Sequence, residues 1–249
     1  MGGAGGAVIL SRGPSAAGSR TGDAGGRDVA ASGPMTWHAT ERARLAEALT
    51  AAGPDAPTLC AGWRSRHLAA HLVVREQAPS LGAGVVVPVL TGRLDEAIDT
   101  LAADAQDADG YAALVERFAT PPPRWSPVSW AGELINVTEY FVHGEDVRRG
   151  AGPVGARPVP DELRDRLWSQ LVAVAPLRLA RLGVGVVLVR PDGVRRRVRS
   201  PRAGHGAVVL RGEVGELVLA VSGRLQAAHV QVEGDEADVA RVREALSGP

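Results

Sequence analysis

Hydrophobic residues recur every three or four positions along much of the first 150 residues, a pattern that predicts amphipathic helices. In the first of them Leu45 and Leu49 share an apolar face, whereas Glu41, Arg42 and Arg44 lie largely on the other side. The helices are joined by short or proline-marked connections, which favours an antiparallel four-helix bundle. The expected helices cover residues 37–52, the stretch from Ser65 to a break that begins at Pro79, residues 92–119 with an interruption near Asp109 and Gly110, and residues 129–149.

The pattern changes after Gly150. One more amphipathic helix is expected over residues 161–181, broken near Pro176, and the hydrophobic period then shifts to two. The alternation predicts a hairpin of residues 184–190 and 194–199, a strand at 207–210, a helix at 214–225, a strand at 229–233 and a helix at 236–246. The fold class is therefore α+β, with a helical bundle over residues 35–152 and a small α+β domain over residues 153–249.

Residues 1–34 consist mainly of Gly, Ala, Ser and Arg, and we expect them to form a disordered tail. The apolar patch at residues 8–10 is too short for the hydrophobic region of a secretory signal. Met35 directly follows this tail and is an alternative translation start, in which case the tail is an annotation artefact.

Composition narrows the possible partners. The chain has 249 residues with 28 basic and 28 acidic side chains, so its formal net charge of 0 gives no indication of nucleic-acid or anionic-membrane binding. Every basic residue is arginine, which we attribute to codon bias. Cys60 is the only cysteine, which excludes an internal disulfide and fits a reducing compartment. No apolar run reaches the roughly 18 residues of a membrane-spanning helix, so we expect a soluble, cytoplasmic protein.

The chemistry of the chain is concentrated in the fourth expected helix. Glu139 and His143 are four residues apart, so both side chains project from the same helix face. His71 stands in an otherwise apolar helical run, and the three residues together would suit a divalent ion such as zinc. Asp146 could orient His143 as a hydrogen-bond partner, or it could pair with Arg148 or Arg149. The alternative is a core histidine at position 71 and a solvated pair of Glu139 and His143.

Other polar residues allow two interpretations each. His67, one turn before His71, could join the site, or it could be a surface residue of the first helical turn. Cys60 is either a reactive thiol or a small buried side chain, and Trp63 is expected to anchor the core. Residues 195–197 are three consecutive arginines, which would attract an anionic substrate or simply form a solvated hairpin edge.

Three segments, residues 57–63, 68–76 and 139–149, together resemble the actinobacterial metal-binding proteins related to mycothiol-dependent maleylpyruvate isomerase. The resemblance covers roughly residues 36–246. It implies a four-helix bundle of the DinB-like superfamily, followed by a small α/β domain with sterol-carrier-like topology. In that family a divalent ion, usually zinc, is held by a histidine of the second helix and a Glu-x-x-x-His of the fourth. By motif, the resemblance implies His71, Glu139 and His143 as the ligands.

The resemblance also implies mycothiol as a co-substrate whose sulfur sits at the metal. Three hypotheses follow: a metal-dependent isomerase or thiol transferase acting on a small electrophile, a metal-binding protein without catalysis, and a carrier of apolar ligands. No substrate-binding arginine of the isomerase can be placed on this chain by motif, and the sequence does not identify catalytic or cofactor-binding residues.

Overall fold

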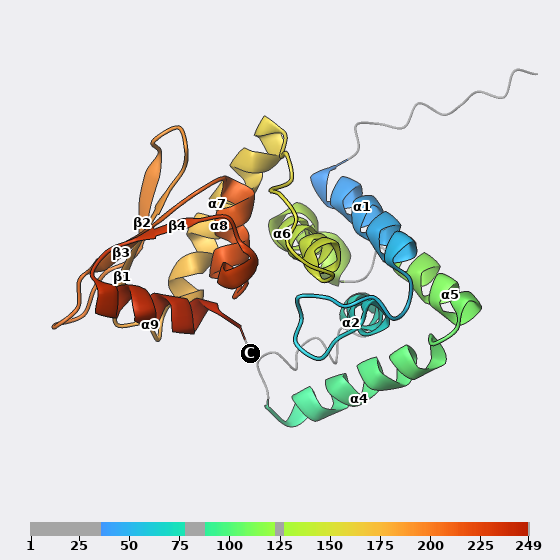
Figure 1. Cartoon of the computed structure of the whole chain (residues 1–249). Helices are drawn as coiled ribbons and strands as arrows, with labels where there is room; N and C mark the ends of the chain where they lie inside the picture. Colours follow the sequence, from blue (N-terminus) through green and yellow to red (C-terminus); the bar gives the residue numbers. More distant parts are fainter. Residues whose placement is uncertain (1–35, 78–87, 123–126, 249) are drawn as a thin grey trace, which may run out of the picture. The chain divides into compact units, whose positions relative to one another are not determined.

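The structure is a computed structural model that describes residues 36–77, 88–122 and 127–248. The predictions for residues 1–34 and for the break after Gln77 fall largely on residues outside these ranges. The α-helices are α1 (Trp37–Ala52), α2 (Ser65–Gln77), α4 (Pro88–Asp104), α5 (Ala108–Ala119), α6 (Pro127–Arg149), α7 (Asp161–Arg178), α8 (Val214–Val221) and α9 (Glu236–Leu246), and the strands are β1 (Gly185–Val189), β2 (Arg195–Arg199), β3 (Ala207–Arg211) and β4 (Gln231–Glu233). The predicted α+β fold class is confirmed (Figure 1).

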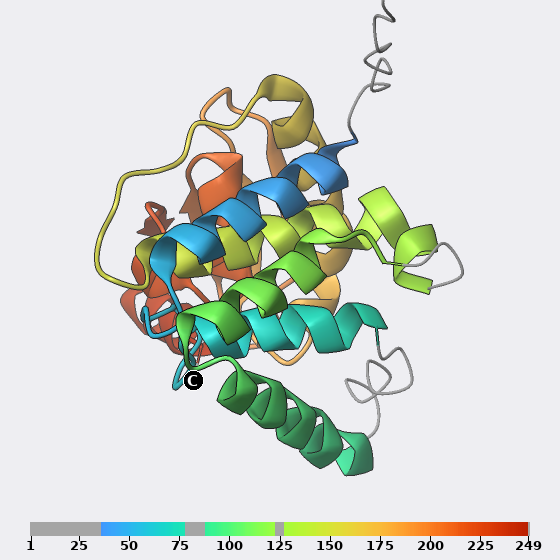
Figure 2. The same cartoon turned by 90° about the vertical axis from the view of Figure 1, so that its right-hand side faces the viewer.

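The helical half differs from the prediction in its third helical region. That region forms two helices, α4 and α5, because the chain leaves the helix after Asp104 and starts a new one at Ala108. Asp107 caps α5 by accepting a hydrogen bond from the backbone N–H of Gly110 at 2.8 Å. The predicted interruption at Asp109 and Gly110 was therefore placed a few residues too late. α5 contacts both α1 and α2, and Figure 2 shows it running between them.

The prediction that Glu41 and Arg42 face away from the core was wrong. Both are buried in α1, with 1% and 5% of their surfaces exposed. Each has found a charged partner, as a buried ion requires. Arg42 donates to Glu76 at 2.7 Å and to the hydroxyl of Tyr140 at 2.6 Å, and Arg157 donates to Glu41 at 2.6 Å.

The C-terminal half contains a four-stranded sheet in the order β2-β1-β3-β4. β1 pairs with β2 in an antiparallel hairpin, as predicted, and its turn contains Gly193 with a φ of 85°. β1 pairs with β3 in parallel, and β3 pairs with β4 in an antiparallel direction. Pro176 does not break α7, because it stands near the helix end, where it removes at most one intrahelical hydrogen bond. α8 ends at Val221, earlier than predicted, because Gly223 adopts a φ of 88°.

Helix α6 belongs to two hydrophobic cores. Tyr140 and Val147 pack into the core of the helical half. Val137 and Phe141, from the same helix, pack into the core that contains the inner faces of β1 and β3. Residues 35–249 accordingly form one compact unit. The domain boundary that we place between residues 152 and 153 remains a prediction.

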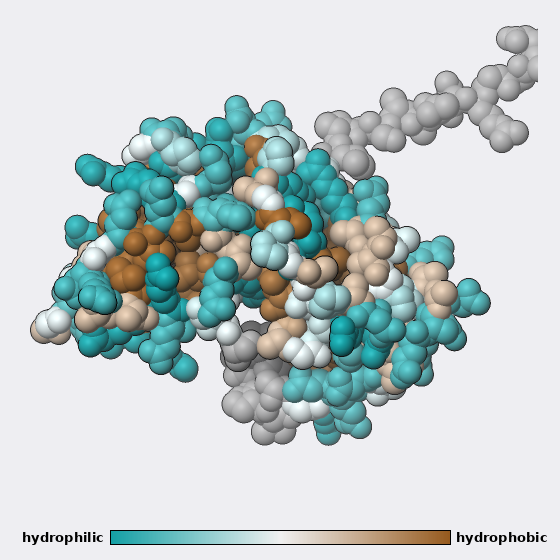
Figure 3. Space-filling model, in the orientation of Figure 1, coloured by the Kyte–Doolittle hydropathy of each residue, from teal (hydrophilic) through white to brown (hydrophobic). Residues whose placement is uncertain are grey.

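The surface is mixed. On the face shown in Figure 3, the most hydrophobic residues gather over the sheet-bearing half, whereas hydrophilic residues predominate over α4 and α5. Three large hydrophobic side chains are conspicuously exposed among the described residues: Val174, Leu177 and Val194. Within the described ranges, no helix combines the length and the apolar character needed to cross a bilayer.

Replacing Arg42 should show how much the helical half depends on its buried ion pair. Arg42→Met removes the arginine that pairs with the buried carboxylate of Glu76 and leaves it the hydrogen bond from the Tyr140 hydroxyl, so we expect the free energy of unfolding to fall by about 3–5 kcal/mol. Urea unfolding followed by circular dichroism measures the change. The matched control is Arg117→Met in α5, an exposed arginine hydrogen-bonded to Gln77, for which we expect a change within about 0.5 kcal/mol. Equal changes in both variants would contradict this account.

Candidate functional site

The structure brings His71, Glu139 and His143 together. His71 comes from α2, and the other two come from successive turns of α6. One ligand atom from each residue lies within 4.8 Å of the other two. The carboxylate of Glu139 is central, because its Oε1 is 3.2 Å from His143 Nε2 and 3.6 Å from His71 Nε2. We call these three residues the HEH set.

Asp146 contacts His143, the first of the two roles considered for it. Its Oδ2 lies 2.9 Å from His143 Nδ1, and its side chain is fully buried. The Nδ1–H of His143 donates to Asp146, and Nε2 faces Glu139, to which it donates when the ring is protonated. Arg148 and Arg149, the alternative partners of Asp146, instead donate to Glu145, at 2.6 and 2.7 Å.

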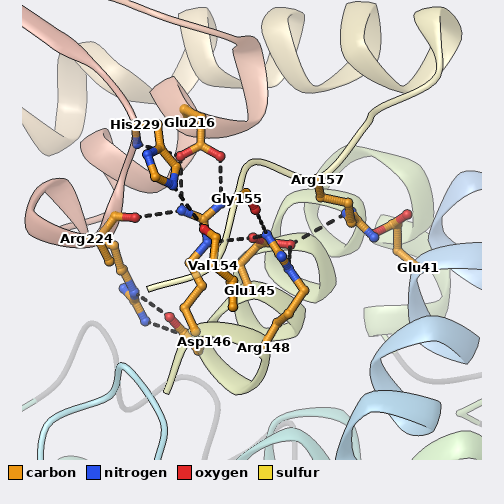
Figure 4. A network of polar contacts seen from close by, with 12 residues as sticks. Glu41, Glu145, Asp146, Arg148, Val154, Gly155, Arg157, Glu216, Arg224 and His229 are labelled. Carbon is orange, nitrogen blue, oxygen red and sulfur yellow. Dashed lines mark hydrogen bonds and ion pairs between the residues drawn. The ribbon is translucent and has the colours of Figure 1, made fainter. Parts of the chain in front are cut away.

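Two contacts of Asp146 come from distant segments and were not predicted. Arg224, after α8, donates from Nε to Asp146 Oδ1 at 2.9 Å and from Nη2 to Oδ2 at 2.7 Å, a two-pronged contact visible in Figure 4. The thiol of Cys60, in the loop between α1 and α2, lies 3.3 Å from Oδ2. Arg224 is separated from Asp146 by 78 positions in the sequence, and Cys60 is separated from it by 86. Side chains so far apart in sequence show no periodic pattern, so spacing could not have revealed either contact.

Arg75 and Trp63 also contact the HEH set. Arg75, one turn after His71 on α2, places its Nε 3.4 Å from Glu139 Oε1 and donates to Asn136 Oδ1 at 3.0 Å. The ring of Trp63 is tilted against that of His71, with 5.3 Å between their centroids. Trp63 is partly buried against the helical core, in keeping with the expected anchoring role.

The remaining residues singled out from the sequence lie elsewhere. His67 Nδ1 accepts a hydrogen bond from the backbone N–H of Arg64 at 3.1 Å, so its ring faces the start of α2 instead of the HEH set. Residues 195–197 are exposed on β2, an edge strand of the sheet. Neither group takes part in the site.

Hydrogen bonds favour the charged forms of Glu139, His143 and Asp146, although burial favours the neutral forms. Burial alone would raise the pKa of Glu139, but hydrogen bonds from His143 and His71 outweigh it and hold that pKa well below the usual value. Burial would lower the pKa of His143, yet hydrogen bonds with Asp146, Cys60 and Glu139 raise it well above the usual value. The pKa of Asp146 is lowered in spite of burial, because His143 and Arg224 stabilise its ionised form.

The donor set fits a divalent transition ion. Two imidazole nitrogens and one carboxylate oxygen converge, which is the three-ligand arrangement typical of zinc sites with positions left for other ligands. His71 Nδ1 is buried and has no hydrogen-bond partner among the described residues. In a metal-bound His71 this nitrogen would carry the ring proton, because Nε2 is the nitrogen that faces Glu139.

Comparisons with known proteins agree with the resemblance. Residues 37–120 match a family model described as the mycothiol maleylpyruvate isomerase N-terminal domain. Two crystal structures of the mycothiol-dependent maleylpyruvate isomerase share the fold: one is 20% identical with a TM-score of 0.52, and a histidine-to-alanine mutant is 19% identical with a TM-score of 0.54. Both matches cover 80% of this chain and 92% of the solved chain. A search of curated proteins found no match.

The predicted resemblance is therefore matched over residues 37–120, and the predicted fold is confirmed by the two solved structures. At 19–20% identity, the solved structures establish the fold of this chain and leave its chemistry to be argued from its own residues.

The titration of His143 tests this geometry in metal-free protein. Because its pKa is raised in the folded state, the stability gained from protonation is complete below about pH 6.5 and is lost as the pH rises through the raised pKa. Asp146→Asn removes the charged hydrogen-bond partner, so the pKa of His143 should fall. Imidazole NMR signals followed against pH measure both values. His67 is the internal control, since burial and the neighbouring Arg66 lower its pKa in both proteins. An unchanged titration of His143 would contradict the role of Asp146.

Proposed function

We propose that this protein binds a divalent metal ion, zinc in the first instance, through His71, Glu139 and His143, and uses it to activate a small-molecule thiol. The convergence of these three side chains from α2 and α6 is the observation that carries the proposal. When bound, the ion would favour the thiolate form of a thiol at an open coordination position.

The protein's own residues prepare the site in three ways. Asp146 accepts a hydrogen bond from the Nδ1–H of His143 and so presents Nε2 as the metal-facing nitrogen. Arg75 stabilises the ionised form of Glu139 from a second helix. Trp63 packs against the ring of His71, with 5.3 Å between the ring centroids, and so restrains its orientation.

The proposed reaction is attack of the thiolate on a small electrophile, either as an isomerisation, in which the thiol is later released, or as a transfer that leaves the thiol on the product. The related structures are of an isomerase that depends on mycothiol, which makes mycothiol the first thiol to test. Mycothiol is the thiol of actinobacteria, so the proposal includes an actinobacterial source and, given the single Cys60, a cytoplasmic location.

A second candidate function rests on a cavity near the site. A cavity of about 330 Å³ lies between the end of α6 and the segment after Arg224, with Leu59, Arg149, Gly150 and Gln226 among its lining residues. Its size and mostly apolar lining suit a small ligand. A metal-containing binding protein without catalysis is therefore the alternative to an enzyme.

Metal content is the first test. Protein purified without chelators or a histidine tag should contain about one equivalent of transition metal, because three side chains suited to such an ion converge. His71→Ala and His143→Ala should each bind zinc at least about 100-fold more weakly in a chelator competition assay. The matched control is His67→Ala, which removes a histidine of α2 outside the HEH set and should leave zinc affinity unchanged. A folded wild type that cannot take up zinc would refute the proposed function.

Turnover separates the two candidate functions. With zinc, mycothiol and an electrophile, either maleylpyruvate or a generic alkylating agent, the wild type should form product at a rate above that of thiol and electrophile alone. His143→Ala should lose at least about 100-fold of that rate, because the thiolate would no longer be favoured. Product formation is measured by chromatography and mass spectrometry. Full zinc binding with no catalysed reaction of any electrophile tested would favour the binding protein.

A further inference from the structure

His143 belongs to two overlapping groups of potential metal ligands. One is the HEH set. The other, which we call the thiol set, consists of Cys60, His143 and Asp146, whose ligand atoms also lie within 4.8 Å of one another. The two sets use opposite nitrogens of the same ring, because Nε2 faces Glu139 and Nδ1 faces Asp146.

The thiol set would be a strong competitor for zinc. It combines sulfur, nitrogen and oxygen ligands, and thiolate sulfur is a preferred ligand of zinc. Its members come from α6 and from the loop before α2, so they are in place without any rearrangement of the chain. Something in the fold must decide which set a metal ion enters.

Arg224 contacts two members of the thiol set, Asp146 and Cys60. Its guanidinium contacts both carboxylate oxygens of Asp146, at 2.9 and 2.7 Å, and its Nη2 lies 3.4 Å from the sulfur of Cys60. A cation thus already occupies the side on which the carboxylate and the sulfur would offer their lone pairs. A divalent ion would have to displace a charge-assisted, two-pronged contact whose carboxylate is fully buried.

The position of Arg224 is itself fixed. Its backbone N–H donates to Leu219 O at 2.9 Å, and its Nη1 donates to Ser222 O at 2.6 Å. The helix that carries this segment, α8, is tied to α6 by Arg149, which donates to Glu216 at 2.6 Å. Figure 4 shows Arg224 reaching Asp146 from this C-terminal segment.

We propose that Arg224 excludes metal ions from the thiol set and thereby reserves His143 for the HEH set. This inference rests on the proposed function. With Arg224 in place, Asp146 accepts a hydrogen bond from the Nδ1–H of His143, and Nε2 remains available beside His71 and Glu139. The protein's own thiol is kept off the metal, so that an open coordination position is left for a small-molecule thiol.

Cobalt(II) is the probe, because a cobalt–thiolate bond gives an intense charge-transfer absorption that nitrogen and oxygen ligands do not give. The wild type should bind cobalt without this absorption. Arg224→Met should gain it, and the double variant Arg224→Met/Cys60→Ser should lose it again. We also expect the affinity of the HEH set for zinc to fall about 10–100-fold in Arg224→Met, since Asp146 is then less well held. The control is Arg211→Met, an exposed arginine of β3 paired with Glu233, which should behave as the wild type.

A charge-transfer band already present in the wild type, or absent from folded Arg224→Met, would overturn the inference. If the wild type binds no cobalt but Arg224→Met binds it through Cys60, the proposed function is wrong and the exclusion by Arg224 is right. If neither protein binds cobalt, both are wrong. A second measurement does not depend on the folding of any variant: saturating the wild type with zinc should leave the alkylation rate of Cys60 unchanged. Protection of Cys60 by zinc would overturn the inference.

Discussion

The candidate site and the two hydrophobic cores depend on helix α6, which is packed on more than one side. Phe141 contributes to the core that includes the sheet, and Tyr140, its neighbour, contributes to the core of the helical half. A helix in this position has little solvent-facing surface, so each polar residue it carries needs a partner from another element or from a neighbouring turn. His143 and Asp146 satisfy each other in this way, and together they account for both the location and the orientation of the site.

The same constraint explains the ion pairs around the end of α6. Glu145 and Arg149 are almost completely buried, they pair with each other at 2.7 Å, and Arg149 also pairs with Glu216 of α8 at 2.6 Å. Buried ion pairs add little net stability compared with apolar residues, but breaking one leaves an uncompensated charge. Such pairs therefore destabilise a wrongly packed α8 more than they stabilise its correct packing on α6. That selectivity holds the segment carrying Arg224 in register with Asp146 (Figure 4).

Local patterns predicted what depends on local geometry. The spacing of Glu139 and His143 placed both on one face of α6, and most helix and strand positions followed from hydrophobic period and turn residues. His71 stood out as a histidine in an apolar helical run, but pairing it with Glu139 and His143 depended on the resemblance to a family, because periodicity does not say which helices face each other. Neither local pattern nor the resemblance predicted the contacts of Arg224 and Cys60 with Asp146, because these contacts depend on how distant segments pack. The burial of Arg42 was not predicted, because the sequence does not distinguish a charged residue with a buried partner from one exposed to water.

The contacts of Asp146 also bear on how the two halves of the chain should be regarded. The residues of the HEH set all lie before Gly150, yet the carboxylate that orients His143 is held by an arginine from the C-terminal half. The helical half by itself would therefore contain the ligands without the contact that fixes them. Any ligand that binds only the folded site adds its binding free energy to folding. Because the site draws on both halves, that stabilisation would extend across the boundary expected near residue 152, and the chain would respond to the metal as one cooperative unit.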